Sequence, residues 1–169
     1  RLMTQFFKVQ VFDYLPDQSF NRPDISLFLL QTIEKMMDRN QSLTLEQKRN
    51  LPIFFIIARP RSGTTLLRTL FDRHSNVIIP LESPFMLRYY WKYRNVKNWT
   101  KENILAFYED ITSEDEPDYL NIRKWTIDLE QLKKDLLAME GEATYAELCR
   151  VVNASYQSLF PKGEIKIAG

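Results

Sequence analysis

Residues 53–65 read IFFIIARPRSGTT and contain the three parts of a strand–turn–helix unit. The first five are apolar and mostly β-branched or aromatic, which predicts a buried strand over Ile53–Ile57. Pro60 and Gly63 bracket a tight turn. Apolar residues then recur at helical spacing and predict a helix with one apolar face, formed by Leu66, Leu67, Leu70 and Phe71.

The predicted turn has the features of a socket for an anion. A strand that turns sharply into a helix leaves the first N–H groups of the helix without partners, and the helix dipole adds positive potential there. Arg61 adds a mobile positive charge, and three hydroxyls add short donors: Ser62, Thr64 and Thr65. A simpler interpretation is a capped helix start, but a cap alone does not need an arginine and three hydroxyls together.

Two common nucleotide-binding loops do not match this sequence. A Walker A loop needs a lysine after its second glycine, whereas here the cationic Arg61 precedes the single glycine, Gly63. A dinucleotide-binding fingerprint needs three glycines. A P-loop small-molecule kinase is therefore a weaker alternative, since it would need a loop lysine and Mg²⁺ ligands.

The segment PRSGTTLL, residues 60–67, resembles the 5′-phosphosulfate-binding loop of sulfotransferases that use 3′-phosphoadenosine 5′-phosphosulfate (PAPS). It is similar to the branch that holds the protein-tyrosine sulfotransferases and their bacterial relatives. The resemblance implies an α/β fold: a P-loop-type three-layer sandwich with a parallel sheet, truncated after about the third strand and carrying a large helical insertion. It implies PAPS as co-substrate, held by residues 61–65 (Arg61, Ser62, Gly63, Thr64 and Thr65), and no metal.

A second predicted strand, Val77–Ile79, is followed closely by Glu82. Ligands of parallel α/β sheets gather outside the carboxyl ends of the strands, so Glu82 is expected near Arg61. The resemblance implies that Glu82 is the catalytic base that takes the acceptor's proton, and that Arg61 stabilises the leaving phosphate. The alternative is that Glu82 caps a helix starting at Ser83 or Pro84.

His74, the single histidine, is a weaker candidate for a base. It is predicted at the far end of the loop helix, where a cation is commonly found for structural reasons.

Residues 83–100 combine aromatic and basic side chains and directly follow the candidate base. They could line a pocket for a hydroxyl-bearing acceptor, which the sequence leaves open as a sugar, phenol, lipid or tyrosyl peptide. An amphipathic helix that buries its aromatics is an equal alternative. Stacking on nucleic acid is disfavoured, because the net charge is only +1.

The whole chain, 1–169, is interpreted as a single incomplete sulfotransferase-like domain. It would contain an N-terminal helical segment (1–50), a nucleotide-binding strand–loop–helix–strand core (53–79) and a helical insertion (83–160). Within these ranges, the pattern predicts a helix over 25–37 with Asp24 as its N-cap. It also predicts helix caps at Thr44, Thr100, Asp128 and Thr144.

Residues 163–169, GEIKIAG, predict the start of a third parallel strand. In the resembling family, the contacts to the 3′-phosphate and adenine come from further along the chain, and they cannot be located here. This stretch alone is therefore expected to bind PAPS weakly or not at all. Uncovered sheet edges and apolar surface would favour further contacts, and a homo-oligomer stays open.

The composition limits the disulfide content, the membrane topology and the cellular location expected for the protein. One cysteine, Cys149, excludes an internal disulfide framework, and no apolar run approaches the length of a membrane span. A bacterial-type cytoplasmic protein is favoured. Because the sequence begins with Arg1, a lost N-terminal anchor and a Golgi-lumen location stay open. The rival to an enzyme is a helical interaction module on an inactive nucleotide-binding scaffold.

Overall fold

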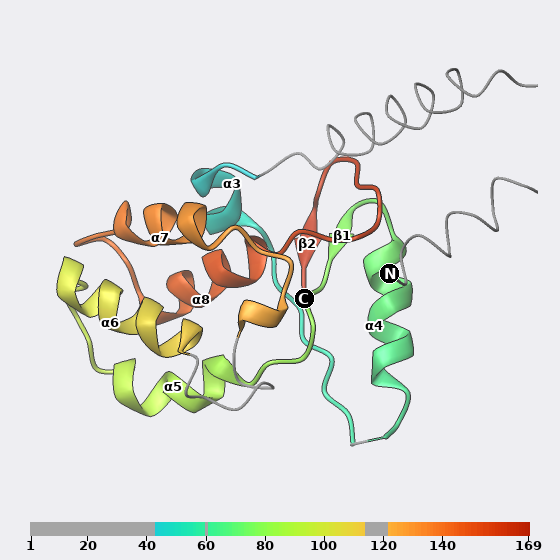
Figure 1. The fold of residues 1–169 in the computed structure, drawn as a ribbon, viewed down its shortest axis with the longest axis horizontal. Coiled ribbons are helices and arrows are strands. Elements are labelled where there is room, and N and C mark those ends of the chain that lie inside the picture. Colours follow the sequence, from blue (N-terminus) through green and yellow to red (C-terminus); the bar gives the residue numbers. More distant parts are fainter. Residues whose placement is uncertain (1–42, 60, 114–121) are drawn as a thin grey trace, which may run out of the picture. The chain divides into compact units, whose positions relative to one another are not determined.

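A computed structural model describes residues 43–59, 61–113 and 122–169 of the chain (Figure 1). All of them belong to one of the two units into which the chain divides, Asp38–Gly169. Pro60 and the helix predicted over 25–37, with its N-cap Asp24, lie outside the described residues.

A small parallel sheet lies at the centre of this unit. Strand β1 (Val77–Ile78) pairs in parallel with β2 (Ile167–Ala168). On the other side of β2, Ile53 forms a parallel bridge to Ala168. The third parallel strand predicted near the end of the sequence is confirmed, and it lies between the other two. The chain therefore combines helices with a small parallel sheet, as an α/β fold requires.

The predicted strand over residues 53–57 is much shorter than expected. The N–H of Phe54 donates to the carbonyl of Ala168 at 2.9 Å, and the ladder ends there. Phe55 is 61% exposed and Ile57 is 93% exposed, so the prediction that this whole run is a buried strand is wrong. The physical reason is that strand β2, the pairing partner of this segment, ends at Ala168, so residues 55–57 have no strand neighbour among the described residues.

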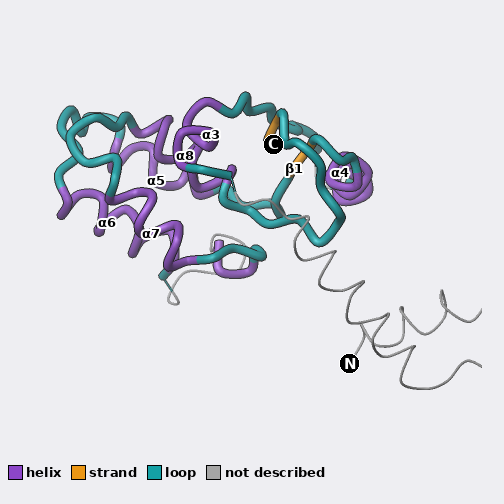
Figure 2. The backbone as a smooth tube through the Cα atoms, turned by 90° about the horizontal axis from the view of Figure 1, so that it is seen from above, coloured by secondary structure: helices purple, strands orange, loops and turns teal. Residues whose placement is uncertain are grey.

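Helix α4 (Thr64–Arg73) lies beside β1, and the other helices lie on the opposite side of the sheet (Figures 1 and 2). These others are α3 (Leu45–Asn50), α5 (Phe85–Tyr93), α6 (Lys101–Thr112), the 3₁₀ helix η1 (Ile122–Lys124), α7 (Leu129–Leu137) and α8 (Tyr145–Ala154).

The four helix caps predicted within the described residues are confirmed. Thr44 and Thr144 each accept from the N–H three residues later and form reciprocal capping boxes with Gln47 and Glu147. Thr100 and Asp128 accept in the same way at the starts of α6 and α7. These boundaries follow from local hydrogen bonding, which is why the sequence alone predicts them.

The core of the unit lies among the helices and is rich in aromatics. Trp99 is fully buried, and its ring stacks against Tyr93 at 5.4 Å between centroids and against Tyr145 at 6.5 Å. Cys149 is also buried, and desolvation raises the pKa of its thiol to about 12. That agrees with its interpretation as a small buried hydrophobe rather than a reactive thiol.

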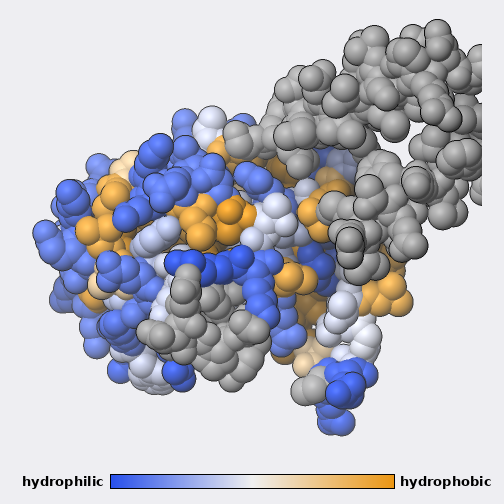
Figure 3. Space-filling view, in the orientation of Figure 1, coloured by the Kyte–Doolittle hydropathy of each residue, from blue (hydrophilic) through white to orange (hydrophobic). Residues whose placement is uncertain are grey.

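The apolar face of α4 is largely exposed in the described unit. Leu66 is 66% exposed and Leu70 is 57% exposed, and Figure 3 shows hydrophobic residues gathered over this helix. Exposed apolar surface is expected from the sequence, and α4 carries part of it. No helix in the described ranges is both long and apolar enough to cross a bilayer.

Candidate functional site

The turn before α4 has the backbone geometry of an anion socket. Arg61 has φ 59° and Gly63 has φ 85°, so two residues of the turn adopt left-handed conformations. Gly63 is also the N-cap of α4 and has no side chain to accept from the first helical N–H groups. Alternating backbone conformations of this kind aim successive N–H groups into one concave space. The predicted sharp corner between strand and helix is therefore present.

The first turn of α4 is open rather than filled by the protein's own groups. The first bond in the helix runs from the N–H of Leu67 to the carbonyl of Gly63 at 3.1 Å. Within the described ranges, no side chain accepts from the N–H groups of Thr64 and Thr65. These donors and the positive end of the helix are available to an anion.

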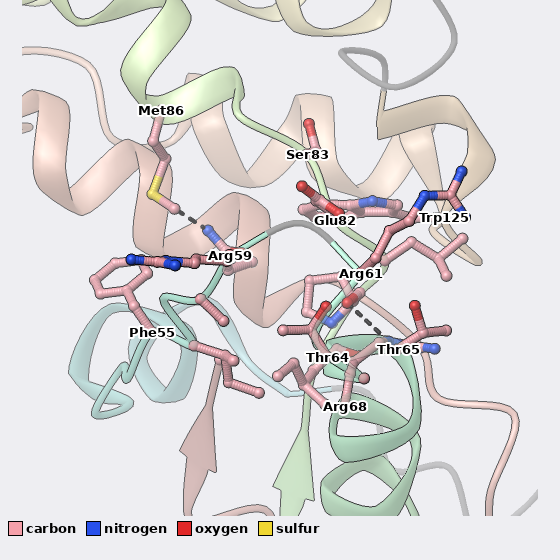
Figure 4. A pocket seen from close by; sticks show the side chains of 18 residues that line it. Phe55, Arg59, Arg61, Thr64, Thr65, Arg68, Glu82, Ser83, Met86 and Trp125 are labelled. Atoms are coloured by element: carbon pink, nitrogen blue, oxygen red, sulfur yellow. Dashed lines mark hydrogen bonds between the residues drawn. The ribbon is translucent and has the colours of Figure 1, made fainter.

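A cavity of about 790 Å³ opens in front of this turn (Figure 4). Its lining comes from segments far apart in the sequence: the turn, the segment that follows β1, Met86 on α5, Trp125 after η1 and Asn153 on α8. Of the five residues predicted to bind the cofactor, four contribute to it: Arg61, Gly63, Thr64 and Thr65. Ser62 is exposed and does not line the cavity.

Glu82 lines the same cavity as Arg61. Both side chains are exposed to solvent, and Figure 4 shows Glu82 beside the ring of Trp125. The alternative role of Glu82 as a helix cap is not seen, because α5 begins at Phe85 with Pro84 as its N-cap and no side-chain cap. Arg61 and Glu82 thus contribute to one cavity, as the sequence analysis expected of residues near each other.

Arg68 is a further cavity residue that the sequence did not single out. Its Nε donates to the carbonyls of Ile79 at 3.1 Å and Pro80 at 2.9 Å. One of its terminal nitrogens donates to the hydroxyl of Tyr156 at 3.0 Å. The available signal was a cationic residue within the otherwise apolar pattern of the loop helix.

Trp125 is a second residue that the sequence analysis missed. It lines the cavity and is only 5% exposed, and its ring meets Phe85 and Tyr156 edge-on. Nothing in its local sequence distinguishes it from an ordinary core tryptophan, because only the fold brings residue 125 next to residue 82.

The aromatic segment at residues 83–100 is mostly core. Phe85, Tyr89, Tyr93 and Trp99 are buried, and from this segment only Ser83 and Met86 line the cavity. No aromatic of this segment lines the cavity, although Tyr90 and Trp91 are exposed to solvent. The alternative, an amphipathic helix that buries its aromatics, describes α5, since residues four apart share its inner face.

His74 lies at the C-terminal end of α4, as its structural interpretation predicts. Its Nδ1 accepts from the N–H of Asn76 at 3.2 Å, and it does not line the cavity. The residues described contain no group of three or more potential metal ligands.

Comparison with known proteins supplies one finding. The family model described as "Sulfotransferase family" matches residues 52–161, which is well over half of the chain. The match begins just before Ile53 and continues beyond Pro84 through the helical region. No curated protein and no solved structure gives a significant match.

Proposed function

Because the chain belongs to the sulfotransferase family, we propose that it moves a sulfuryl group from PAPS to an acceptor hydroxyl by in-line displacement. Family membership indicates sulfuryl transfer in general. The observation that carries the finer proposal is the shared cavity, which has the open N-terminus of α4 and Arg61 on one side and Glu82 on another. In this proposal, the chain is part of a P-loop-type sandwich whose helical region, 83–160, is an insertion.

The anion socket would hold the 5′-phosphosulfate of PAPS. The N–H groups and hydroxyls of Thr64 and Thr65 supply short donors at the positive end of the helix. The guanidinium of Arg61 would stabilise the negative charge that grows on the bridging oxygen as the S–O bond to the phosphate breaks. Such a preorganised donor typically contributes ~10²–10³-fold to the rate.

Glu82 would act as the general base. As the acceptor oxygen forms its bond to sulfur, its proton passes to the Glu82 carboxylate, and 3′,5′-adenosine bisphosphate leaves. A base within hydrogen-bond reach typically contributes ~10²–10⁴-fold. A sulfuryl group carries less charge than a terminal phosphoryl group, so fixed donors and one arginine can serve without a metal in this proposal.

The acceptor is proposed only as a hydroxyl-bearing molecule that fits the cavity. The lining combines apolar side chains, among them Met86 and Trp125, with a few polar ones, which is typical of sites for small molecules.

The test compares binding with turnover in the full-length protein. We expect calorimetric titration to show binding of 3′,5′-adenosine bisphosphate and much weaker binding of ATP, and Arg61→Ala to weaken the former. Glu82→Gln should lower kcat about 10²–10⁴-fold while the affinity for the bisphosphate stays within a factor of about two. The matched controls are Arg73→Ala, at the exposed far end of α4, and Glu109→Gln, exposed on α6.

Two results would contradict the proposal. One is equal binding of ATP and the bisphosphate, which would favour a kinase. The other is full biological activity of both Arg61→Ala and Glu82→Gln, which would favour a non-catalytic interaction module.

A further inference from the structure

Arg68 joins the helix of the anion socket to the segment that carries Glu82. It lies on α4, and its side chain is only 18% exposed. Its Nε donates to two successive backbone carbonyls, those of Ile79 at 3.1 Å and Pro80 at 2.9 Å. Figure 4 shows Arg68 beneath Arg61, on the same side of the cavity.

Asp72, one turn later on α4, holds the same segment from a second direction. Its side chain is fully buried and accepts from the N–H of Ile79 at 3.2 Å. It also pairs with a terminal nitrogen of Arg68 at 3.6 Å. The hydroxyl of Tyr156 lies between the two, accepting from Arg68 at 3.0 Å and donating to Asp72 at 3.1 Å. Both the N–H and the carbonyl of Ile79 are therefore bound by side chains of α4.

These bonds matter because regular structure does not hold the residues before Glu82. Strand β1 ends at Ile78 and α5 begins at Phe85, so Glu82 lies in the irregular segment between them. Strand pairing fixes the backbone only up to β1. Beyond it, the bonds from Arg68 to Ile79 and Pro80 set the direction in which the chain leaves the sheet.

Two of the three nitrogens of Arg68 already have partners within the protein. Its Nε and one terminal nitrogen already serve two carbonyls and a hydroxyl, whereas Arg61 has no partner among the residues described. This division suits Arg61 for a bound anion and Arg68 for holding the backbone.

We propose that Arg68 is a positioning residue that fixes Glu82 relative to the anion socket. This inference rests on the proposed role of Glu82 as the base. It predicts that loss of the guanidinium lowers the rate of the chemical step by displacing the base, without removing a ligand of the cofactor.

The test uses Arg68→Met and Arg68→Lys in the full-length protein, with Arg73→Met as the matched control. Arg73 is an exposed arginine of the same helix whose guanidinium lies 5.8 Å from the ring centroid of Phe160. Three quantities are measured: the exchange rate of the Ile79 amide by NMR, the affinity for 3′,5′-adenosine bisphosphate, and kcat and KM for sulfuryl transfer.

We expect Arg68→Met to lower kcat about 10- to 100-fold, since the carbonyls of Ile79 and Pro80 lose a charged donor. The Ile79 amide should exchange roughly tenfold faster, because the segment is held more loosely and Asp72, which accepts from this amide, loses its Arg68 partner. The bisphosphate affinity and KM should stay within about threefold. Arg68→Lys keeps the positive charge but loses the planar set of guanidinium donors, so an intermediate kcat is expected. It also serves as the folded variant for these measurements if Arg68→Met fails to fold. Arg73→Met should change none of the three quantities.

Three results would overturn the inference. Unchanged exchange at Ile79 in either variant would show that Arg68 does not hold this segment. Faster exchange with wild-type kcat would show that the segment does not control the base. A loss of bisphosphate affinity of tenfold or more with unchanged exchange would make Arg68 an anion ligand instead. A wild-type protein without sulfuryl transfer would refute the proposed function, and the exchange measurement would still decide whether Arg68 holds the segment.

Discussion

The buried carboxylate of Asp72 fastens α4 to the rest of the unit, so its removal is expected to be costly. We expect Asp72→Ala to lower the free energy of unfolding by about 3–5 kcal/mol, the range for breaking a buried ion pair by removing one partner. That is a large part of the stability of an ordinary domain, about 5–15 kcal/mol.

The contacts of Asp72 lead to this magnitude. Its carboxylate accepts from the N–H of Ile79 at 3.2 Å, the hydroxyl of Tyr156 at 3.1 Å and the hydroxyl of Ser158 at 2.9 Å. It also lies 3.5 Å from the ammonium of Lys162, a residue that is only 8% exposed. Removing the carboxylate leaves a buried cation without its counter-ion.

Part of this loss is offset locally, because the Lys162 ammonium also donates to the carbonyls of His74 at 3.1 Å and Val77 at 2.6 Å. Those bonds remain in the variant, which favours the lower end of the range, about 3 kcal/mol.

Urea unfolding followed by far-ultraviolet circular dichroism measures the change. Asp128→Ala serves as the reference variant, since it removes an N-cap and should lower the free energy of unfolding by about 1 kcal/mol. The double variant Asp72→Ala/Lys162→Met should recover at least about 1 kcal/mol relative to Asp72→Ala, because it removes the uncompensated charge. The reasoning is wrong if Asp72→Ala costs no more than Asp128→Ala, or if the two substitutions at 72 and 162 are additive.

Two further predictions concern the socket and the response to pH. Gly63→Ala is expected to weaken binding of 3′,5′-adenosine bisphosphate about tenfold in calorimetry, because φ 85° costs an L-residue ~1–2 kcal/mol although no neighbour lies within 4 Å of the added Cβ. Gly141→Ala, at φ 79° and equally unobstructed, should leave binding unchanged. Burial and the nearby Asp72 raise the pKa of Tyr156 from 10.0 to about 12, so its contribution to stability is complete below pH 10 and is lost as the pH rises towards 12. Urea unfolding at about pH 9 and pH 11 should therefore show a loss of about 1 kcal/mol more in the wild type than in Tyr156→Phe, because at pH 11 the hydroxyl is largely ionised in the unfolded chain but still mostly protonated in the folded one, and equal losses would contradict this.

Much of the local structure was predictable because it depends on neighbours in the sequence. The caps at Thr44, Thr100, Asp128 and Thr144 use hydrogen bonds that span three residues. The turn before α4 needs a residue with a left-handed backbone conformation at position 63, and glycine adopts that conformation most readily. The juxtaposition of Arg61 and Glu82 followed from a general rule about strand ends rather than from any contact visible in the sequence.

The extent of the first strand and the lining of the cavity were not predictable in this way. Apolar composition indicated a strand over residues 53–57, but a strand exists only as far as a neighbouring backbone pairs with it, and that neighbour is more than 100 residues away. The aromatic pattern after Glu82 is compatible with either a pocket wall or a buried helix face. The structure shows the buried face, and this depends on how α5 packs against the other helices.

By itself, the sequence determined the turn and helix start of the socket, the first residues of four further helices and the family, because each depends on short-range hydrogen bonding or on a contiguous motif. The tertiary structure alone decided that Arg68, Asp72 and Tyr156 meet, and that Trp125 stands beside Glu82. These contacts arise because helix packing buries polar groups, which then need hydrogen-bond partners. The residues involved are far apart in the sequence, so no local sequence pattern predicts that they meet.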